Sequence, residues 1–71
     1  MTVDEILKTI RKTLNISQEQ LARELEISFT TINRWENGKR KPSHLAKMRL
    51  TEYCADKGIS KDIIDAIENT R

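Results

Sequence analysis

The segment Ser17–Ser43, SQEQLARELEISFTTINRWENGKRKPS, decides how the rest of the chain is organised. Its first part predicts a short helix, because Ser17 is followed three residues later by Gln20, the spacing of a reciprocal capping box. The apolar stripe of this helix consists of Leu21, Ala22 and Leu25. A bend at Glu26–Ile27 is then expected to end the helix and turn the chain.

A second short helix is predicted directly after the bend, with Ser28 as its cap. Ile32 and Trp35 are expected to point inward, and Asn37–Gly38 to end the helix in the left-handed conformation that these residue types tolerate. A basic run follows at once, made of Lys39, Arg40 and Lys41. Two helices joined by so short a turn form a helix-turn-helix, here over about residues 17–37, whose second helix can enter the DNA major groove.

The same stretch resembles the helix-turn-helix of the Cro/C1-type repressors, also called the XRE family, to which lambdoid phage repressors belong. Four segments carry the resemblance: the SQEQLA opening, the IS pair before the second helix, the TINRWENGK run and the Pro-Ser after it. It extends back to Arg11 and so covers about half of the chain. The combination is specific, whereas an isolated Ser-x-x-Gln would be weak. It implies a lambda repressor-like fold that binds double-stranded operator DNA.

The flanking segments predict three more helices and no strand. Thr2–Glu5 is another capping box, which places the start of the first helix near Val3. Two further helices are expected from His44 to about Ala55 and from Lys61 to about Asn69. The prediction is an all-α fold, a compact bundle of five short helices around a helix-turn-helix, as a single domain of residues 1–71.

The expected core collects the inward positions of all five helices. They are Ile6, Ile10, Leu14, Leu21, Leu25, Ile27, Ile32, Trp35, Leu50, Cys54, Ile59, Ile63 and Ile67. Leu45 and Met48 lie off the inward face of their helix, and Ile64 lies about 100° from that of the last helix. Because operators of the XRE family are commonly two-fold, we expect a homodimer in which Ile64, with Leu45 or Met48, forms a small contact.

Composition and charge narrow the class of protein. The formal net charge is only +2 at pH 7, yet residues 34–49 contain six basic residues and one acidic residue, a local charge of +5. Charge alone would favour a solvated surface; next to a helix-turn-helix it favours contact with phosphates. The single cysteine excludes an internal disulfide and suits a reducing cytoplasm, and no apolar run approaches the ~20 residues of a membrane span.

The base-contacting candidates lie at or near the start of the second helix. They are Ser28, Phe29, Thr30, Asn33 and Arg34, and the resemblance implies base contacts for the last four. Asn33 could form a bidentate pair of hydrogen bonds with adenine. Arg34 could form a bidentate pair with guanine or bind a phosphate, and we favour the guanine contact. Phe29 stands where the family often has a polar residue, so it is either a contact to a thymine methyl or a core or dimer aromatic.

The resemblance also implies residues that hold the DNA backbone and the fold. Phosphate contacts are expected from Gln18, Asn37, Lys39, Arg40 and Lys41. Arg11 and Glu36 match a pair that joins the first helix to the end of the reading helix in relatives, and we expect a structural ion pair there. Glu26 stands where the family commonly has glycine, so a left-handed backbone at this position would cost roughly 1 kcal/mol.

The sequence offers no cluster of ligands with metal spacing, no glycine-rich phosphate loop and no nucleophile–base pair. We therefore expect neither a metal nor another cofactor, and no enzyme. The leading hypothesis is a sequence-specific DNA-binding protein, a transcriptional regulator of the repressor type. The alternative is a protein-interaction module, such as the antitoxin of a toxin–antitoxin pair, with Leu45, Met48 and Ile64 as its partner surface.

Overall fold

Five helices and no strand are found in residues 1–70, the part of the chain that this computed structural model describes. In chain order they are α1 (Val3–Leu14), α2 (Gln18–Leu25), α3 (Phe29–Glu36), α4 (His44–Asp56) and α5 (Lys61–Asn69). The predicted all-α fold of five short helices is confirmed. Within residues 1–70, no helix has the length and apolar character needed to cross a membrane.

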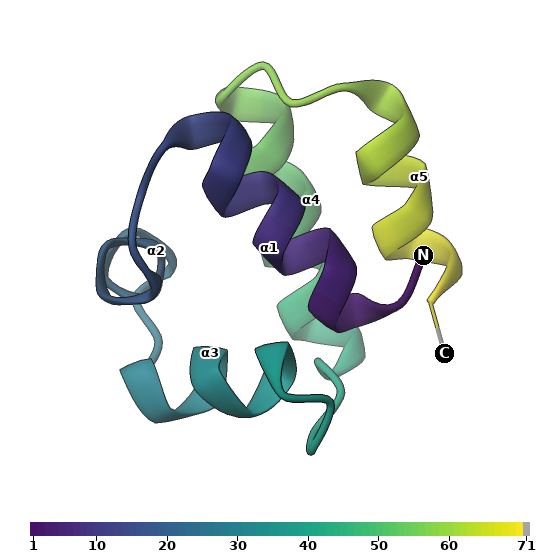
Figure 1. Cartoon of the computed structure of the whole chain (residues 1–71). Helices are drawn as coiled ribbons and strands as arrows, with labels where there is room; N and C mark the ends of the chain where they lie inside the picture. The colour runs from purple at the N-terminus through teal and green to yellow at the C-terminus, as the bar shows by residue number, and fades with distance from the viewer. Residues whose placement is uncertain (71) are drawn as a thin grey trace.

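The arrangement of the helices leaves one side of α3 open. In Figure 1, α1 crosses the front with α4 behind it, α2 is seen end-on at the left, α3 runs along the bottom and α5 stands at the right. α3 packs against α1 and α2, and α4 packs against α5. The lower side of α3 is therefore free to meet a partner while its upper side is held by two helices.

Each helix begins directly after its capping residue, and one predicted capping hydrogen bond differs. The Thr2 capping box is present, with the Thr2 N–H donating to Glu5 Oε1 over 3.1 Å. Ser17 Oγ accepts from the Gln20 N–H at 3.0 Å, but the predicted return bond from the Gln20 side chain is wrong. The Gln20 carboxamide points along the helix instead, where its nitrogen donates to Glu24 Oε2 at 2.5 Å and its oxygen accepts from Arg23 Nη1 at 3.4 Å.

The bend between α2 and α3 has the left-handed backbone that the sequence suggested. Glu26 has φ 58° and ψ 42°, and the Ile27 N–H closes the turn onto the Ala22 carbonyl at 3.0 Å. A side chain with a Cβ costs roughly 1 kcal/mol in this conformation. Gly38, with φ 72°, makes the corresponding reversal after α3, and a glycine there carries no such penalty.

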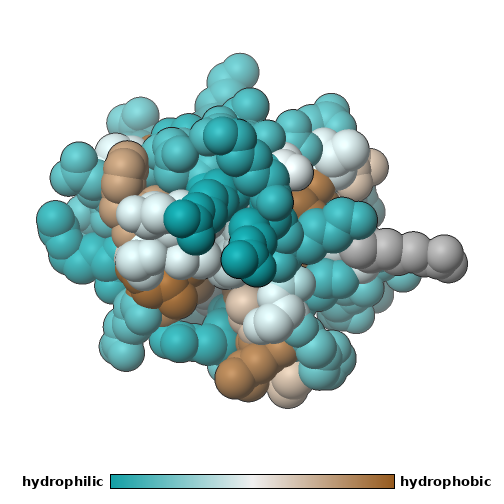
Figure 2. Space-filling model, turned by 90° about the horizontal axis from the view of Figure 1, so that it is seen from below, coloured by the Kyte–Doolittle hydropathy of each residue, from teal (hydrophilic) through white to brown (hydrophobic). Residues whose placement is uncertain are grey.

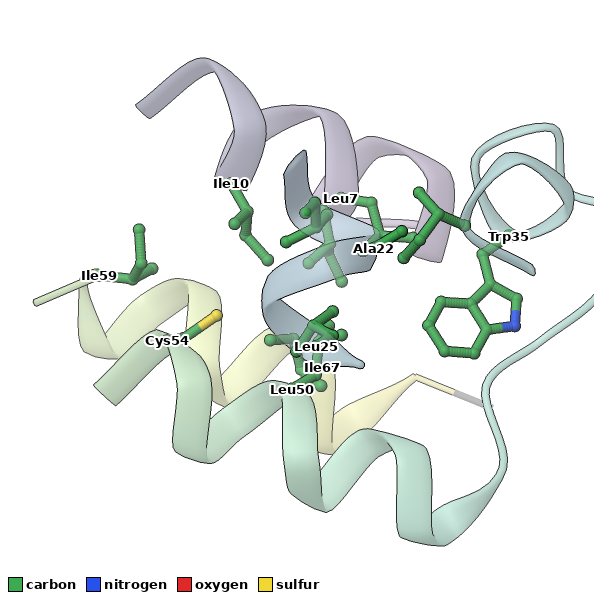
Figure 3. Packing of buried hydrophobic residues seen from close by; sticks show 12 residues of the cluster. Leu7, Ile10, Ala22, Leu25, Trp35, Leu50, Cys54, Ile59 and Ile67 are labelled. Atoms are coloured by element: carbon green, nitrogen blue, oxygen red, sulfur yellow. The ribbon is translucent and has the colours of Figure 1, made fainter. Parts of the chain in front are cut away.

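The core lies between the five helices (Figure 3). Its buried members are Ile6, Leu7, Ile10, Leu21, Ala22, Leu25, Ile32, Trp35, Leu50, Cys54, Ile59 and Ile67. Leu14, Ile27 and Ile63, which the sequence also predicted for the core, are half-buried and pack against this cluster, and the predicted core lacked Leu7 and Ala22. Helix ends and turns leave one side of a residue open to solvent, which explains why Leu14 and Ile27 are only half covered.

The two faces of α4 differ as expected. Leu50 and Cys54 are buried, whereas Leu45 is 67% exposed and Met48 is 48% exposed. Burial raises the pKa of the Cys54 thiol to about 11, so the thiolate is not populated near neutral pH and the residue fills space in the core. His44 is exposed at the start of this helix.

Candidate nucleic-acid interface

The second helix of the motif, α3, presents one side to the core and another to solvent. Ile32, Trp35 and Glu36 are buried. Phe29, Thr30, Asn33, Arg34 and Asn37 lie on the other side, within an arc of about 140°, whereas Ser28 caps the helix outside that arc. Asn33 is half-buried, and the other five residues are exposed.

Figure 2 views the molecule from below, the side on which α3 and the loop after it lie in Figure 1. The face is mostly hydrophilic, with separate hydrophobic patches toward its margins. Phe29 is 46% exposed, so it is not a core residue, and the interpretations that remain are a groove contact and a dimer contact. An exposed aromatic ring at the first residue of α3 can make apolar contacts with whatever α3 approaches.

The hydroxyl of Ser28 is already used within the helix. Ser28 Oγ accepts from the Thr31 N–H at 3.1 Å and lies 2.7 Å from the Thr31 hydroxyl oxygen. The cap therefore engages the polar atom that a base contact would need. Thr31, which the sequence reasoning did not single out, is held beside the site by the same pair of hydrogen bonds.

A chain of carboxamides connects the two helices of the motif. Asn33 Nδ2 donates to Gln18 Oε1 at 3.2 Å, and Asn37 Nδ2 donates to Asn33 Oδ1 at 2.9 Å. Gln18 is the first residue of α2, so the backbone amides of the helix N-terminus lie next to its side chain. The structure thus brings Gln18, Asn33 and Asn37 together along one edge of α3.

The basic loop follows this edge. Lys39, Arg40 and Lys41 are exposed after the Gly38 reversal, and none of the three forms an ion pair within the described residues. Arg40 and Lys41 line an open hollow with residues at the start of α1, including Asp4. Three cations without carboxylate partners beside the exposed side of α3 form a surface that attracts polyanions.

Arg11 and Glu36 meet in a two-pronged ion pair. Arg11 Nε lies 2.7 Å from Glu36 Oε2, and Nη2 lies 2.7 Å from Oε1. The Glu36 side chain is 1% exposed and that of Arg11 is 25% exposed. The hydrogen bonds from Arg11 to this carboxylate raise the pKa of the guanidinium further above its ordinary value. Arg11 Nη1 also reaches the Ile16 carbonyl at 3.5 Å, so one side chain ties α1 to the entry of α2 and the end of α3.

A second polar link, which the sequence reasoning missed, holds α2 to α4. The Tyr53 hydroxyl donates to Glu24 Oε1 at 2.8 Å, and Lys57 Nζ lies 3.5 Å from the same oxygen. The hydrogen bonds from Gln20 and Tyr53, with the Lys57 charge, hold the pKa of Glu24 below its usual value. No local pattern could have indicated this contact, because Glu24 and Tyr53 are 29 residues apart.

The described residues contain no group of three or more His, Cys, Asp or Glu side chains placed to hold a metal ion. What the site offers is a hydrogen-bonding and electrostatic surface around α3. The arrangement of α2, the tight left-handed turn and α3 is that of a helix-turn-helix domain.

Comparison with known proteins agrees with this class. The sequence model of the helix-turn-helix family matches residues 7–43, just over half of the chain. The chain belongs to the XRE family of helix-turn-helix DNA-binding domains. It is also similar to the HTH-type transcriptional activator BcrR of Enterococcus faecalis, with 44% identity over 43 residues, which are 61% of this chain and 21% of that protein. The chain thus matches about a fifth of the length of this relative. No solved structure matches the chain.

Proposed function

We propose that this protein is a sequence-specific DNA-binding transcriptional regulator that places α3 in the major groove of operator DNA. The observation that carries the proposal is the exposed side of α3 together with the unpaired basic loop directly after it. A recognition helix needs both, since groove contacts specify the sequence and phosphate contacts fix the position. In this arrangement Thr30 and Arg34 read base edges, and Phe29 contacts a thymine methyl.

The binding is tested by selecting sites from a random duplex with the full chain, followed by titration of the enriched duplex at several salt concentrations. We expect a short motif to be enriched, and its affinity to fall steeply with salt. A chain that retains no affinity for any duplex at low salt would overturn the proposal.

The direction of regulation is a separate part of the proposal. We propose repression, following the resemblance to Cro/C1-type repressors, although the similar BcrR is named an activator. A promoter that carries the selected site upstream of a reporter should be expressed less when the chain is present. Higher expression would instead make the protein an activator.

Arg40→Ala should weaken binding without changing which sequence is preferred. Arg40 is exposed in the loop after α3, where a guanidinium reaches phosphates rather than bases. We expect the slope of log K against log salt to flatten by about one unit and all duplexes to lose affinity by a similar factor. A salt slope equal to that of the unmodified chain would remove Arg40 from the interface.

The protein-interaction alternative rests on one specific observation, the exposed Leu45 and Met48 on α4. Surface apolar side chains of this size would suit a protein partner, as an antitoxin holds its toxin. We favour the use of this surface for a second copy of the chain bound to the same operator. A single α3 reads only a few base pairs, which gives little selectivity among the ~10⁶–10⁹ competing sites of a genome.

Met48→Glu is the sharper test of this dimer, because Ile64 is half-buried against the chain's own core and its replacement would also disturb folding. We expect cooperative binding to a duplex with two half-sites to disappear, while binding to one half-site survives. Thr13→Glu, an equal change in charge at an exposed position of α1, is the matched control. Unchanged cooperativity in the Met48→Glu variant would place the dimer contact elsewhere.

A further inference from the structure

The carboxamide of Asn33 is occupied on both sides before any DNA arrives. Its nitrogen donates to Gln18 Oε1 at 3.2 Å, and its oxygen accepts from Asn37 Nδ2 at 2.9 Å. The side chain is half-buried, unlike those of Thr30 and Arg34, which are exposed. Recognition of adenine by asparagine takes both of these atoms at once, the oxygen for N6 and the nitrogen for N7. One N–H and one oxygen lone pair of Asn33 are thus already engaged within the chain, and both of these bonds constrain how its half-buried amide could turn toward a base.

The bond to Gln18 determines which end of the Gln18 carboxamide faces outward. Because Gln18 Oε1 accepts from Asn33, the Nε2 group keeps both of its N–H donors for other partners. Gln18 is the first residue of α2, where the free backbone amides and the helix dipole favour an anion. With its amide reversed, Gln18 would instead present an oxygen acceptor to that anion and repel it.

Asn37 completes the arrangement from the other end. Its N–H group donates to Asn33 Oδ1, which leaves the Asn33 nitrogen as the only atom that can turn toward Gln18. Asn37 is the residue that follows α3, with φ −94° and ψ 0°, and its backbone N–H is bonded to the Asn33 carbonyl at 3.0 Å. Asn37 at the end of α3 therefore orients the Asn33 amide, and the Asn33 amide in turn orients the Gln18 amide at the start of α2.

We propose that Asn33 is a positioning residue that orients Gln18 toward a DNA phosphate, and that it does not read a base. The inference rests on the proposed DNA-binding function and replaces the adenine contact that the sequence suggested for Asn33. Base reading is then confined to the exposed residues of α3. The hydrogen bond from Asn33 also fixes the direction in which Gln18 donates. The contact between Gln18 and the phosphate therefore helps set the angle at which α3 enters the groove.

The test is a double-mutant cycle with Gln18→Ala and Asn33→Ala, measured on the selected duplex and on duplexes with single base-pair changes. Alanine is the best helix former, so both variants should fold, and thermal melting checks this. Loss of one orienting hydrogen bond should weaken binding by Asn33→Ala about three- to tenfold, by a similar factor on every duplex. The double variant should bind within about twofold of Gln18→Ala alone, because Asn33 acts through Gln18. The salt slope should not change, since a neutral carboxamide displaces no counterion from the phosphate.

Thr30→Ala is the matched control, an exposed residue of the same helix whose side chain makes no hydrogen bond within residues 1–70. It should relax the preference at one base pair and combine additively with Gln18→Ala. Two results would overturn the role of Asn33: additivity in its own cycle, or a preference lost at a single base pair in Asn33→Ala. Both leave the DNA-binding function standing. If the full chain binds no duplex at all, both the proposed function and the role of Asn33 are overturned.

Discussion

Arg11→Ala is expected to lower the free energy of unfolding by about 3–5 kcal/mol, the loss typical when one partner of a buried pair is removed. Glu36 is 1% exposed and accepts two hydrogen bonds of 2.7 Å from the Arg11 guanidinium. Without Arg11 its charge would remain in the interior with no counterion. A chain of 71 residues has a total stability of about 4–10 kcal/mol, so the variant would lose a large part of its stability.

Urea denaturation of both proteins measures this loss. Arg11→Met combined with Glu36→Leu is the informative control, since replacing a whole buried pair by apolar residues of similar size is often close to neutral. We expect the double variant to regain most of the stability that Arg11→Ala loses. A fully stable Arg11→Ala protein with weak DNA binding would contradict the structural role and make Arg11 a phosphate contact.

Leu7→Ala should be the most damaging single truncation in the apolar core, at about 2–5 kcal/mol. Leu7 is fully buried on α1, a helix that packs against α3 and α5, and removing its three terminal carbons leaves a cavity that the short helices around it can only partly close. The measurement is again the midpoint and slope of urea unfolding. The two largest effects would thus both come from α1, which lies outside the DNA-contacting surface.

Leu45→Ala provides the comparison for Leu7. The two substitutions remove the same atoms from helices of similar length, but Leu45 is 67% exposed. We expect Leu45→Ala to change the stability by no more than about 0.5 kcal/mol. Similar losses for the two variants would mean that Leu45 is covered in solution, as in a dimer that persists without DNA.

The helix boundaries were predictable because the signals that set them are local. Thr2, Ser17, Ser28 and Ser43 each occupy the cap position that their side chains favour. The left-handed turn at Glu26 was suggested by the resemblance, because the family commonly has at this position the glycine that the conformation prefers. These features depend on atoms within about one helical turn of each other, and a sequence pattern contains that information.

Side-chain direction inside the site was less predictable, since it depends on what neighbouring helices offer. Ser28 remains a predicted base contact, and the structure adds that its hydroxyl is hydrogen-bonded to Thr31 within the chain. Gln20 had the spacing of a capping box, but its carboxamide points along the helix, where it donates to Glu24 and accepts from Arg23. The sequence was compatible with more than one partner for each of these side chains, and the packed structure shows which hydrogen bonds form within the chain.

By itself the sequence determined the class of fold, the places where the helices begin and end, and the basic run after α3. The Arg11–Glu36 pair came from resemblance to a family, since nothing local links residues 25 apart. Only the tertiary structure decided that Leu7 is fully enclosed, that Tyr53 reaches Glu24, and that Asn33 turns toward Gln18. The physical reason is that capping and helix propensity act over three or four residues, whereas these contacts depend on how whole helices cross and on which partner each side chain meets there.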